Sequence, residues 1–223
     1  GAAVIVIDDL ADRPLDADLL VDPNPAADPA LKYRAVLAPD VPMCAGTAYA
    51  LLDAAYTTRT PRRPAALVQC IGIFMGGTDP GGHSAWALQV LRGRVGWTGA
   101  VRVASTRTNP GLPALRQAVA ADGHCALQLD QADLLDFHTA CDLQLGAGGG
   151  ALWERCALGV PTVALITADN QLQSVPWAEA RGAVRGLDAR LRSDAQADDL
   201  AAAVRMLLGD PAARRALHDQ GRA

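Results

Sequence analysis

Short apolar runs alternate with segments of helical periodicity between residues 64 and 181. The apolar runs predict strands at Ala66–Met75, Ala100–Ala104, Ala126–Leu129, Leu143–Leu145 and Thr162–Ile166. The segments between them predict helices at His83–Leu91, Leu112–Ala121, Asp133–Cys141, Ala151–Leu158 and Gln171–Arg181. Because strands and helices alternate along the chain, we expect an α/β fold with a parallel, doubly wound sheet.

The two ends of the chain have a different pattern. Two further helices are predicted near the C-terminus, at Ala197–Leu208 and Pro211–Asp219, the second with Asp210 as its cap. The first sixty residues contain strand-like runs at Val4–Ile7 and Leu19–Val21 and a predicted helix at Ala48–Tyr56. They lack the regular alternation of the later part, which indicates a separate unit.

The stretch TPRRPAA, residues 60–66, has the composition of a linker between two domains. We therefore expect residues 1–62 to be the remainder of an N-terminal Rossmann-like domain. Residues 63–223 are expected to form a nearly complete second domain. The chain opens directly on the strand-like run AAVIVID, which is typical of an internal fragment.

Composition narrows the functional classes. Half of the residues are hydrophobic, so a sizeable core can form, and the net charge of −4 argues against a nucleic-acid partner. No apolar run is long enough to span a membrane. The five cysteines form no C-x-x-C motif, which favours free thiols in the cytoplasm. We assign no metal and no cofactor, and the sequence leaves the oligomeric state open.

The first motif with possible chemistry is MGGTDPGGHS, residues 75–84, directly after a predicted strand. Gly76 and Gly77 permit a tight turn and the close approach of a ligand to the backbone. Thr78, Asp79 and Ser84 are candidate caps of the following helix. An anion at the start of this helix and an ordinary glycine-rich connection explain the motif equally well.

The second motif is GAGGGALWE, residues 146–154, after another predicted strand. Successive backbone N–H groups can hold a phosphate when no Cβ stands in the way, which explains Gly148, Gly149 and Gly150. Glu154 lies one turn into the next helix, where a carboxylate can accept two hydrogen bonds from a ribose diol. The alternative is that Glu154 only interacts favourably with the helix dipole.

A third polar loop, ADNQ at residues 168–171, follows the next strand. The amides of Asn170 and Gln171 suit sugar hydroxyl or acetamido groups, although a helix cap is also plausible. Because the carboxyl ends of parallel strands share one edge of a sheet, the three loops together predict a nucleotide-type cleft.

Other polar residues carry weaker signals. The Asp8–Asp9 pair ends a strand, where it can line a site or cap a turn, with Arg13 neutralising it. His83 is a candidate phosphate contact or a surface loop residue. The other histidines, at 124, 138 and 218, are predicted on the surface or on helix faces, without a chemical role.

The order of several segments resembles one known family. These segments are VIDDLADRPLDADLLVDPN, CAGTAYALLDAAY, FMGGTDP, TNPGLPAL and DLQLGAGGGALWERCALGVPTVALITADNQ. They resemble the UDP-2,4-diacetamido-2,4,6-trideoxy-β-L-altropyranose hydrolases of pseudaminic acid biosynthesis, which are also similar to spore-coat polysaccharide biosynthesis proteins. The resemblance covers nearly the whole chain and is most specific from Gly146 to Gln171.

The resemblance implies a GT-B-like fold of two Rossmann-like domains with a UDP-sugar between them. It implies hydrolysis at the anomeric carbon, with water activated by a base and UDP as the leaving group. It implies diphosphate contacts from Gly76, Gly77, Thr78, Gly148, Gly149 and Gly150, a ribose contact from Glu154, and sugar contacts from Asn170 and Gln171. The expected base is a histidine upstream of Gly1, so no catalytic residue is assigned.

Two positions depart from the family pattern. Leu15 stands where members typically have histidine, and Asp53 stands where arginine is common. Two other functions are also compatible with the same motifs. One is a GT-B glycosyltransferase that uses a UDP-amino sugar, and the other is a non-catalytic module that binds a UDP-sugar.

Overall fold

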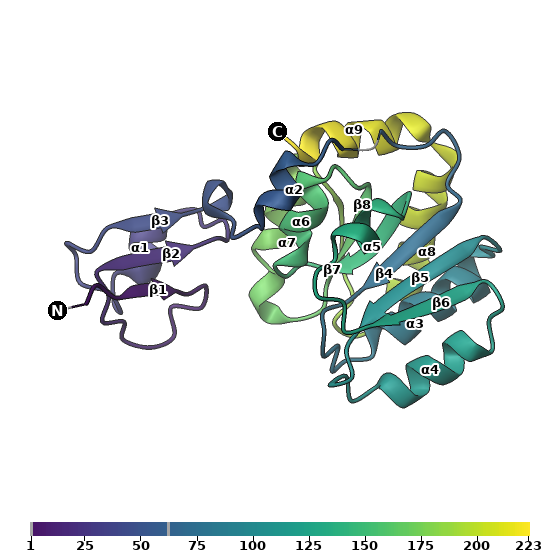
Figure 1. The fold of residues 1–223 in the computed structure, drawn as a ribbon, viewed down its shortest axis with the longest axis horizontal. Coiled ribbons are helices and arrows are strands. Elements are labelled where there is room, and N and C mark those ends of the chain that lie inside the picture. The colour runs from purple at the N-terminus through teal and green to yellow at the C-terminus, as the bar shows by residue number, and fades with distance from the viewer. Residues whose placement is uncertain (1, 62) are drawn as a thin grey trace.

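The computed structural model describes residues 2–61 and 63–223, which form two parallel β-sheets (Figure 1). The small sheet contains β1 (Ile5–Ile7), β2 (Leu19–Asp22) and β3 (Met43–Ala45), with β2 in the middle. The helix α1 (Pro29–Tyr33) connects β2 to β3. A 3₁₀ helix at Thr47–Tyr49 and the short helix α2 (Ala54–Thr58) follow and bring the chain to the large sheet.

The large sheet has six parallel strands in the order β6-β5-β4-β7-β8-β9. Their bounds are β4 (Cys70–Phe74), β5 (Ala100–Ser105), β6 (Cys125–Leu129), β7 (Leu143–Ala147), β8 (Thr162–Ile166) and β9 (Arg185–Asp188). In chain order this is 3-2-1-4-5-6, the order of a Rossmann-type sheet. The order reverses between β4 and β7, and ligands of such sheets bind at the carboxyl ends of the strands beside this switch point.

Helices cover the large sheet. They are α3 (His83–Gln89), continued by a π-helix at Val90–Val95, α4 (Leu112–Ala120), α5 (Leu135–Thr139), α6 (Ala151–Ala157), α7 (Ser174–Ala180), α8 (Asp194–Gly209) and α9 (Pro211–Gly221). A 3₁₀ helix at Asp169–Gln171 precedes α7. Figure 1 shows α2 beside α6, at the end of the segment that links the two sheets.

The core lies along the central strands of the large sheet. Ile71, Ile73, Leu143, Leu145 and Leu165 have no exposed surface. Every residue of β7 and β8 is buried, because helices cover both faces of these strands. This explains why they appear in the sequence as continuous apolar runs.

The predicted α/β fold with a parallel, doubly wound sheet is confirmed, with differences in several elements. The strand expected at Ala66–Met75 is shorter, and the expected helix at Gln171–Arg181 begins only at Ser174. The strands β3 and β9 and the helix α1 were not predicted. Asp210 caps α9 as expected, accepting hydrogen bonds from Ala212 N and Ala213 N.

The continuous helix predicted at Ala48–Tyr56 is wrong. Ala50 has ψ of 128°, which is incompatible with a helix, and the chain reaches α2 only at residue 54. There the Asp53 carboxylate accepts a hydrogen bond from Ala55 N and caps α2. Leu52 lies in the break and packs against apolar residues around α6, so tertiary packing interrupts the helix.

The proposed linker, residues 60–66, leads into the large sheet. Its Arg62, where the expected domain boundary falls, lies outside the described residues. On either side of it the chain contributes to different sheets: residues before it form β1–β3, and residues after it form β4–β9.

Candidate functional site

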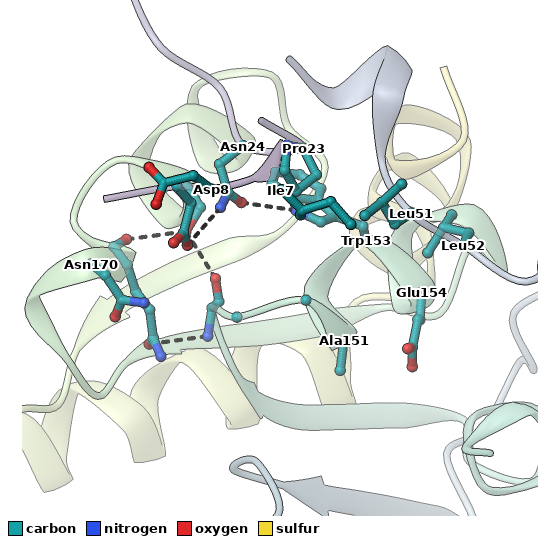
Figure 2. Close-up of a pocket in the computed structure, with 16 residues that line it drawn as sticks. Ile7, Asp8, Pro23, Asn24, Leu51, Leu52, Ala151, Trp153, Glu154 and Asn170 are labelled. Carbon is teal, nitrogen blue, oxygen red and sulfur yellow. Dashed lines mark hydrogen bonds between the residues drawn. The ribbon is translucent and has the colours of Figure 1, made fainter. Parts of the chain in front are cut away.

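A cavity of about 340 Å³ lies where the small sheet meets the carboxyl edge of the large sheet. From the small sheet it receives Ile7, Asp8 and Asp9 at the end of β1, and Pro23 and Asn24 after β2. Leu51 and Leu52 form part of its wall. The large sheet supplies the loop after β7 with the start of α6, and the segment around Asn170 before α7 (Figure 2).

The glycine loop after β7 forms one wall of this cavity, and its first glycine is required by packing. A Cβ at Gly148 would lie 2.2 Å from Val175 Cγ2 and 3.3 Å from Gln171 Cβ. The N–H of Gly148 donates to Leu165 O at 3.0 Å and to Gln171 Oε1 at 3.2 Å. Gly148 is therefore fixed by its neighbours, and its N–H group is already engaged within the protein.

The next two glycines lie in a different environment. A Cβ at Gly149 or Gly150 would meet no atom within 4 Å, and neither residue has a positive φ. Within the described part of the chain, no acceptor is found for their N–H groups. Neither packing nor backbone strain explains these two glycines, whereas close approach of a ligand to the cavity wall does.

Glu154 lines the cavity from the first turn of α6 and is partly exposed. Its Oε2 lies 3.1 Å from Nε2 of His138, a fully buried side chain at the end of α5. One oxygen of the Glu154 carboxylate is therefore in contact with the buried ring of His138. In Figure 2 its side chain lies below Trp153 and Leu52, away from Asp8.

Asn170 and Gln171 both line the cavity, but they differ in exposure and in the hydrogen bonds that they make within the protein. Asn170 is exposed and its side chain lies at the cavity (Figure 2). Gln171 is buried, and its Oε1 accepts from Thr167 N at 2.9 Å as well as from Gly148 N. The Gln171 carbonyl group therefore ties two loops together, and only its amide nitrogen remains to face a ligand.

The glycines of the first motif are not among the residues that line the cavity. Gly76, Gly77 and Thr78 follow β4, the strand beside β7, so they lie at the same sheet edge but outside the cavity wall. Gly76 has φ of +89°, which explains the glycine, and Gly77 O accepts from Thr106 Oγ1 at 2.8 Å. Only the second and third motifs meet directly in this structure.

Of the three candidate caps, Asp79 caps α3. Its Oδ1 accepts from His83 N at 2.8 Å and its Oδ2 from Ser84 N at 2.9 Å. The prediction that His83 contacts a phosphate or lies on the surface is wrong. The ring is buried, and its Nε2 lies 3.1 Å from Ala189 O, so His83 packs α3 against the loop after β9.

Asp79→Asn is expected to reduce the free energy of unfolding by about 1–3 kcal/mol at neutral pH. Burial alone raises the pKa of Asp79, but hydrogen bonds from His83 and Ser84 outweigh it and lower the pKa below the ordinary value. The ionised carboxylate therefore stabilises the fold above the unfolded value of about 3.9, and this contribution disappears as the pH falls through the folded value.

Urea unfolding at pH about 7 and about 3 measures this difference. Asp28→Asn is the matched control, because Asp28 caps α1 at an exposed position and asparagine caps almost as well. An Asp79→Asn effect as small as that of the control, or one that grows in acid, would contradict the assignment.

The N-terminal acidic pair both lines the cavity and shapes a turn, as the two interpretations of the sequence allowed. Asp8 Oδ2 accepts from Ala11 N at 2.8 Å, and Arg13 Nη1 lies 3.1 Å from Asp8 Oδ1. Asp9 faces the cavity and accepts a hydrogen bond from Asn24 Nδ2 at 3.1 Å. Asn24 Oδ1 in turn accepts from Trp153 Nε1 at 3.2 Å.

These hydrogen bonds connect the small sheet to α6 across the cavity. Figure 2 shows the hydrogen bond between Asn24 and Trp153. Sequence reasoning missed Asn24 and Trp153 as site residues. The only signal was the position of Asn24 just after a short strand, which would place it at the same edge as Asp9.

His138 and His218 were predicted on the surface or on helix faces, and they lie in the helices α5 and α9, but buried rather than on the surface. His138 is fully buried, and His218 is 5% exposed, with Nδ1 2.6 Å from Gly159 O. His124 is exposed, as expected. Helical periodicity places a residue on a face, but the partner that buries that face comes from elsewhere in the chain.

Over residues 2–61 and 63–223, no group of three or more histidine, cysteine, aspartate or glutamate side chains has the geometry to hold a metal ion. Within the same ranges, no helix combines the length and apolar character needed to cross a membrane. The cysteines at 44, 70, 125, 141 and 156 are free thiols.

Neither protein-family models nor curated proteins match the sequence, whereas solved structures match the fold. WaaG, a glycosyltransferase involved in lipopolysaccharide biosynthesis, is 14% identical with a TM-score of 0.61, covering 91% of this chain and 57% of that one. MurG from Acinetobacter baumannii is 14% identical with a TM-score of 0.60, and the match covers 92% of this chain and 61% of MurG. UDP-GlcNAc 2-epimerase from Neisseria meningitidis, bound to UDP-GlcNAc, is 17% identical with a TM-score of 0.53. The match covers 67% of this chain and 39% of the epimerase.

The fold therefore defines a class: this is an α/β protein with a Rossmann-type, GT-B-like architecture. The predicted fold class is confirmed. The chain spans between 39% and 61% of the three chains that it matches. At these identities the comparisons establish the fold, and the chemistry has to be argued from the site.

Proposed function

We propose that this chain binds a UDP-sugar in the 340 Å³ cavity, with the nucleotide on the side of the large sheet. The observation that carries the proposal is the pair Gly149 and Gly150. Both residues line the cavity at the carboxyl end of β7, beside the switch point of the sheet, and a Cβ at either would meet no atom within 4 Å. They would donate to the diphosphate, and the neighbouring Glu154 would accept from the ribose hydroxyls.

The small sheet would supply the opposite wall, so residues 1–62 and 63–223 would act as two domains around one ligand. Asn170 and the Gln171 amide nitrogen would contact the sugar. Gly76, Gly77 and Thr78 would reach the diphosphate only if the ligand extends past the cavity toward the end of β4. Two solved structures with similar folds hold ligands of this kind: the epimerase from Neisseria meningitidis is bound to UDP-GlcNAc, and MnaA from S. aureus is bound to UDP.

For the reaction, we propose hydrolysis at the anomeric carbon of a UDP-linked diacetamido trideoxy sugar, as in nonulosonic acid biosynthesis in the cytoplasm. The family resemblance supports this reaction. Water would attack the anomeric carbon, the C–O bond to the diphosphate would break, and UDP would leave with its negative charge stabilised by the glycine N–H groups. The base that removes the proton of the water is not assigned among the residues of this chain.

A glycosyltransferase is the second candidate, because WaaG and other proteins with this fold are glycosyltransferases. An acceptor-free assay of UDP release separates the two reactions. If the chain is a competent hydrolase, UDP should appear from the UDP-diacetamido sugar in water alone. A transferase would need an added acceptor. UDP-sugar binding without turnover would favour the binding-module alternative, and failure to bind UDP would overturn the proposed site itself.

A further inference from the structure

The buried His138 contacts two different side chains through its two ring nitrogens. Nδ1 lies 2.8 Å from Oε1 of Gln144 in β7, and Nε2 lies 3.1 Å from Oε2 of Glu154 in α6. His138 has no exposed surface, and Gln144 is 1% exposed. Each nitrogen of this ring therefore faces one oxygen, and water has no free access to the ring.

The orientation of Gln144 determines which nitrogen of His138 carries hydrogen. Gln144 Nε2 donates to the backbone oxygen of His138 at 3.1 Å, which fixes Oε1 as the atom that faces the ring. An amide oxygen only accepts hydrogen bonds, so Nδ1 of His138 must carry the hydrogen. A neutral imidazole has only one N–H group, so its Nε2 would then direct a bare lone pair at Glu154.

Two bare acceptors cannot form this contact. With neutral His138 and ionised Glu154, a nitrogen lone pair and a carboxylate oxygen would face each other at 3.1 Å in a largely buried place. Such an arrangement sets two lone pairs against each other, which is strongly unfavourable away from water. One additional proton between the two atoms converts the contact into a charge-assisted hydrogen bond.

We propose that His138 and Glu154 share one proton between Nε2 and Oε2, and that His138 is a positioning residue that aims Glu154 at the bound nucleotide. The positioning role rests on the proposed function, since it assumes that Glu154 accepts from the ribose. The shared proton does not depend on that assumption. While the proton is present, Oε2 is fixed by the ring and the carboxylate is held at the cavity.

Among the ionisable groups around the ring, Cys70 exchanges protons near neutral pH, because its contact with Cys141 lowers its pKa to about 7, but it is present in every His138 variant. The others do not. Tyr56 of α2 has its ring centre 6.4 Å from that of His138, and burial, together with the charge of Glu154, raises the pKa of Tyr56. Contact with Cys70 and burial raise the pKa of Cys141, which follows α5. Burial lowers the pKa of Arg155, beside Glu154 in α6, to about 10. Tyr56 and Cys141 therefore stay neutral and Arg155 stays charged.

These surroundings act on the shared proton in a defined way. Burial lowers the pKa of His138, the hydrogen bond with Glu154 raises it, and the charge of Arg155 lowers it further. The net effect of these surroundings is a His138 pKa below its ordinary value. As the pH rises, the pair loses this proton to solvent, Oε2 loses its donor, and the carboxylate is free to rotate away from its binding orientation.

Binding of UDP-GlcNAc should therefore weaken by about threefold to tenfold as the proton is lost, the equivalent of one hydrogen bond. Titration calorimetry from about pH 5.5 to about pH 8.5 covers the range in which histidine exchanges protons. The diphosphate of a UDP-sugar has no ionisable proton in this range, so the ligand does not cause the change. His138→Gln keeps an N–H donor for Glu154 without an ionisable group, so its binding should not vary with pH. His138→Leu removes the donor and should bind weakly throughout.

The ring nitrogens of the ligand-free protein provide a second, independent measurement by ¹⁵N NMR, with His138→Gln identifying the signals. We expect Nδ1 to carry hydrogen and Nε2 to be partly protonated at neutral pH. An Nε2 with the shift of a bare lone pair would overturn the shared proton. Equal pH dependence in the wild type and His138→Gln would overturn the positioning role, provided that thermal unfolding shows both folded. No binding by any variant would overturn the proposed function, and the NMR result would still decide the proton.

Discussion

Replacing Glu154 with alanine should weaken UDP binding by about tenfold to a hundredfold. The carboxylate lies at the cavity on the first turn of α6, where it would accept hydrogen bonds from the ribose hydroxyls. Removing an acceptor of this kind leaves a desolvated donor without a partner, which costs about 1–3 kcal/mol. Titration calorimetry of UDP against wild type and variant measures the difference.

A nucleotide control shows whether the lost contact is to the ribose. Wild-type protein should bind 2′-deoxy-UDP more weakly than UDP, while Glu154→Ala should bind the two equally. Glu154→Gln serves as the structural control, because a glutamine amide can still donate to Nε2 of His138. Unchanged UDP affinity in Glu154→Ala would show that the nucleotide does not contact this carboxylate.

Gly148→Ala should lower the free energy of unfolding by about 1–3 kcal/mol, the usual effect of overpacking a core. The added Cβ would lie 2.2 Å from Val175 Cγ2, in the buried cluster beneath α7, so either Val175 or the loop after β7 must move. The Gly148 hydrogen bond to Gln171 depends on the same backbone position. Urea unfolding measures the loss of stability.

Gly149→Ala is the matched control, one residue further along the same loop. Its Cβ would meet no atom within 4 Å, so the free energy of unfolding should change by no more than about 0.5 kcal/mol. The proposed diphosphate contact predicts weaker UDP binding in this variant, because the methyl group would occupy the ligand's path. Equal loss of stability in both variants would contradict the distinct roles assigned to the two glycines.

Much of the large sheet could be predicted from the sequence because its central strands are buried on both faces. Apolar runs such as Leu143–Leu145 and Thr162–Ile166 appear directly in the amino-acid pattern. The edge strand β9, with the sequence RGLD, is half exposed and polar, so it shows no such run. The strand β3 was missed for another reason: it is only three residues long and partly buried, so it is too short to form a recognisable run.

The candidate site could be predicted only as far as it depends on loops that follow strands. The glycine loop and Asn170 were found in this way, and both line the cavity. The hydrogen bond between Asn24 and Trp153 joins residues 129 positions apart, and nothing in the local sequence indicates it. His138 was missed for a similar reason, since its burial arises from β7 and α6 closing over α5.

In the proposed complex, a UDP-sugar binds with its nucleotide against Gly149 and Gly150. The most direct test is a titration of the ¹⁵N-labelled protein with UDP, followed by backbone amide NMR. We expect the largest shifts at these two amides and at the side-chain N–H of Trp153. A UDP titration that leaves these signals unchanged, or that shifts only the groove beside Trp97 and His124 at the opposite edge of the sheet, would contradict it.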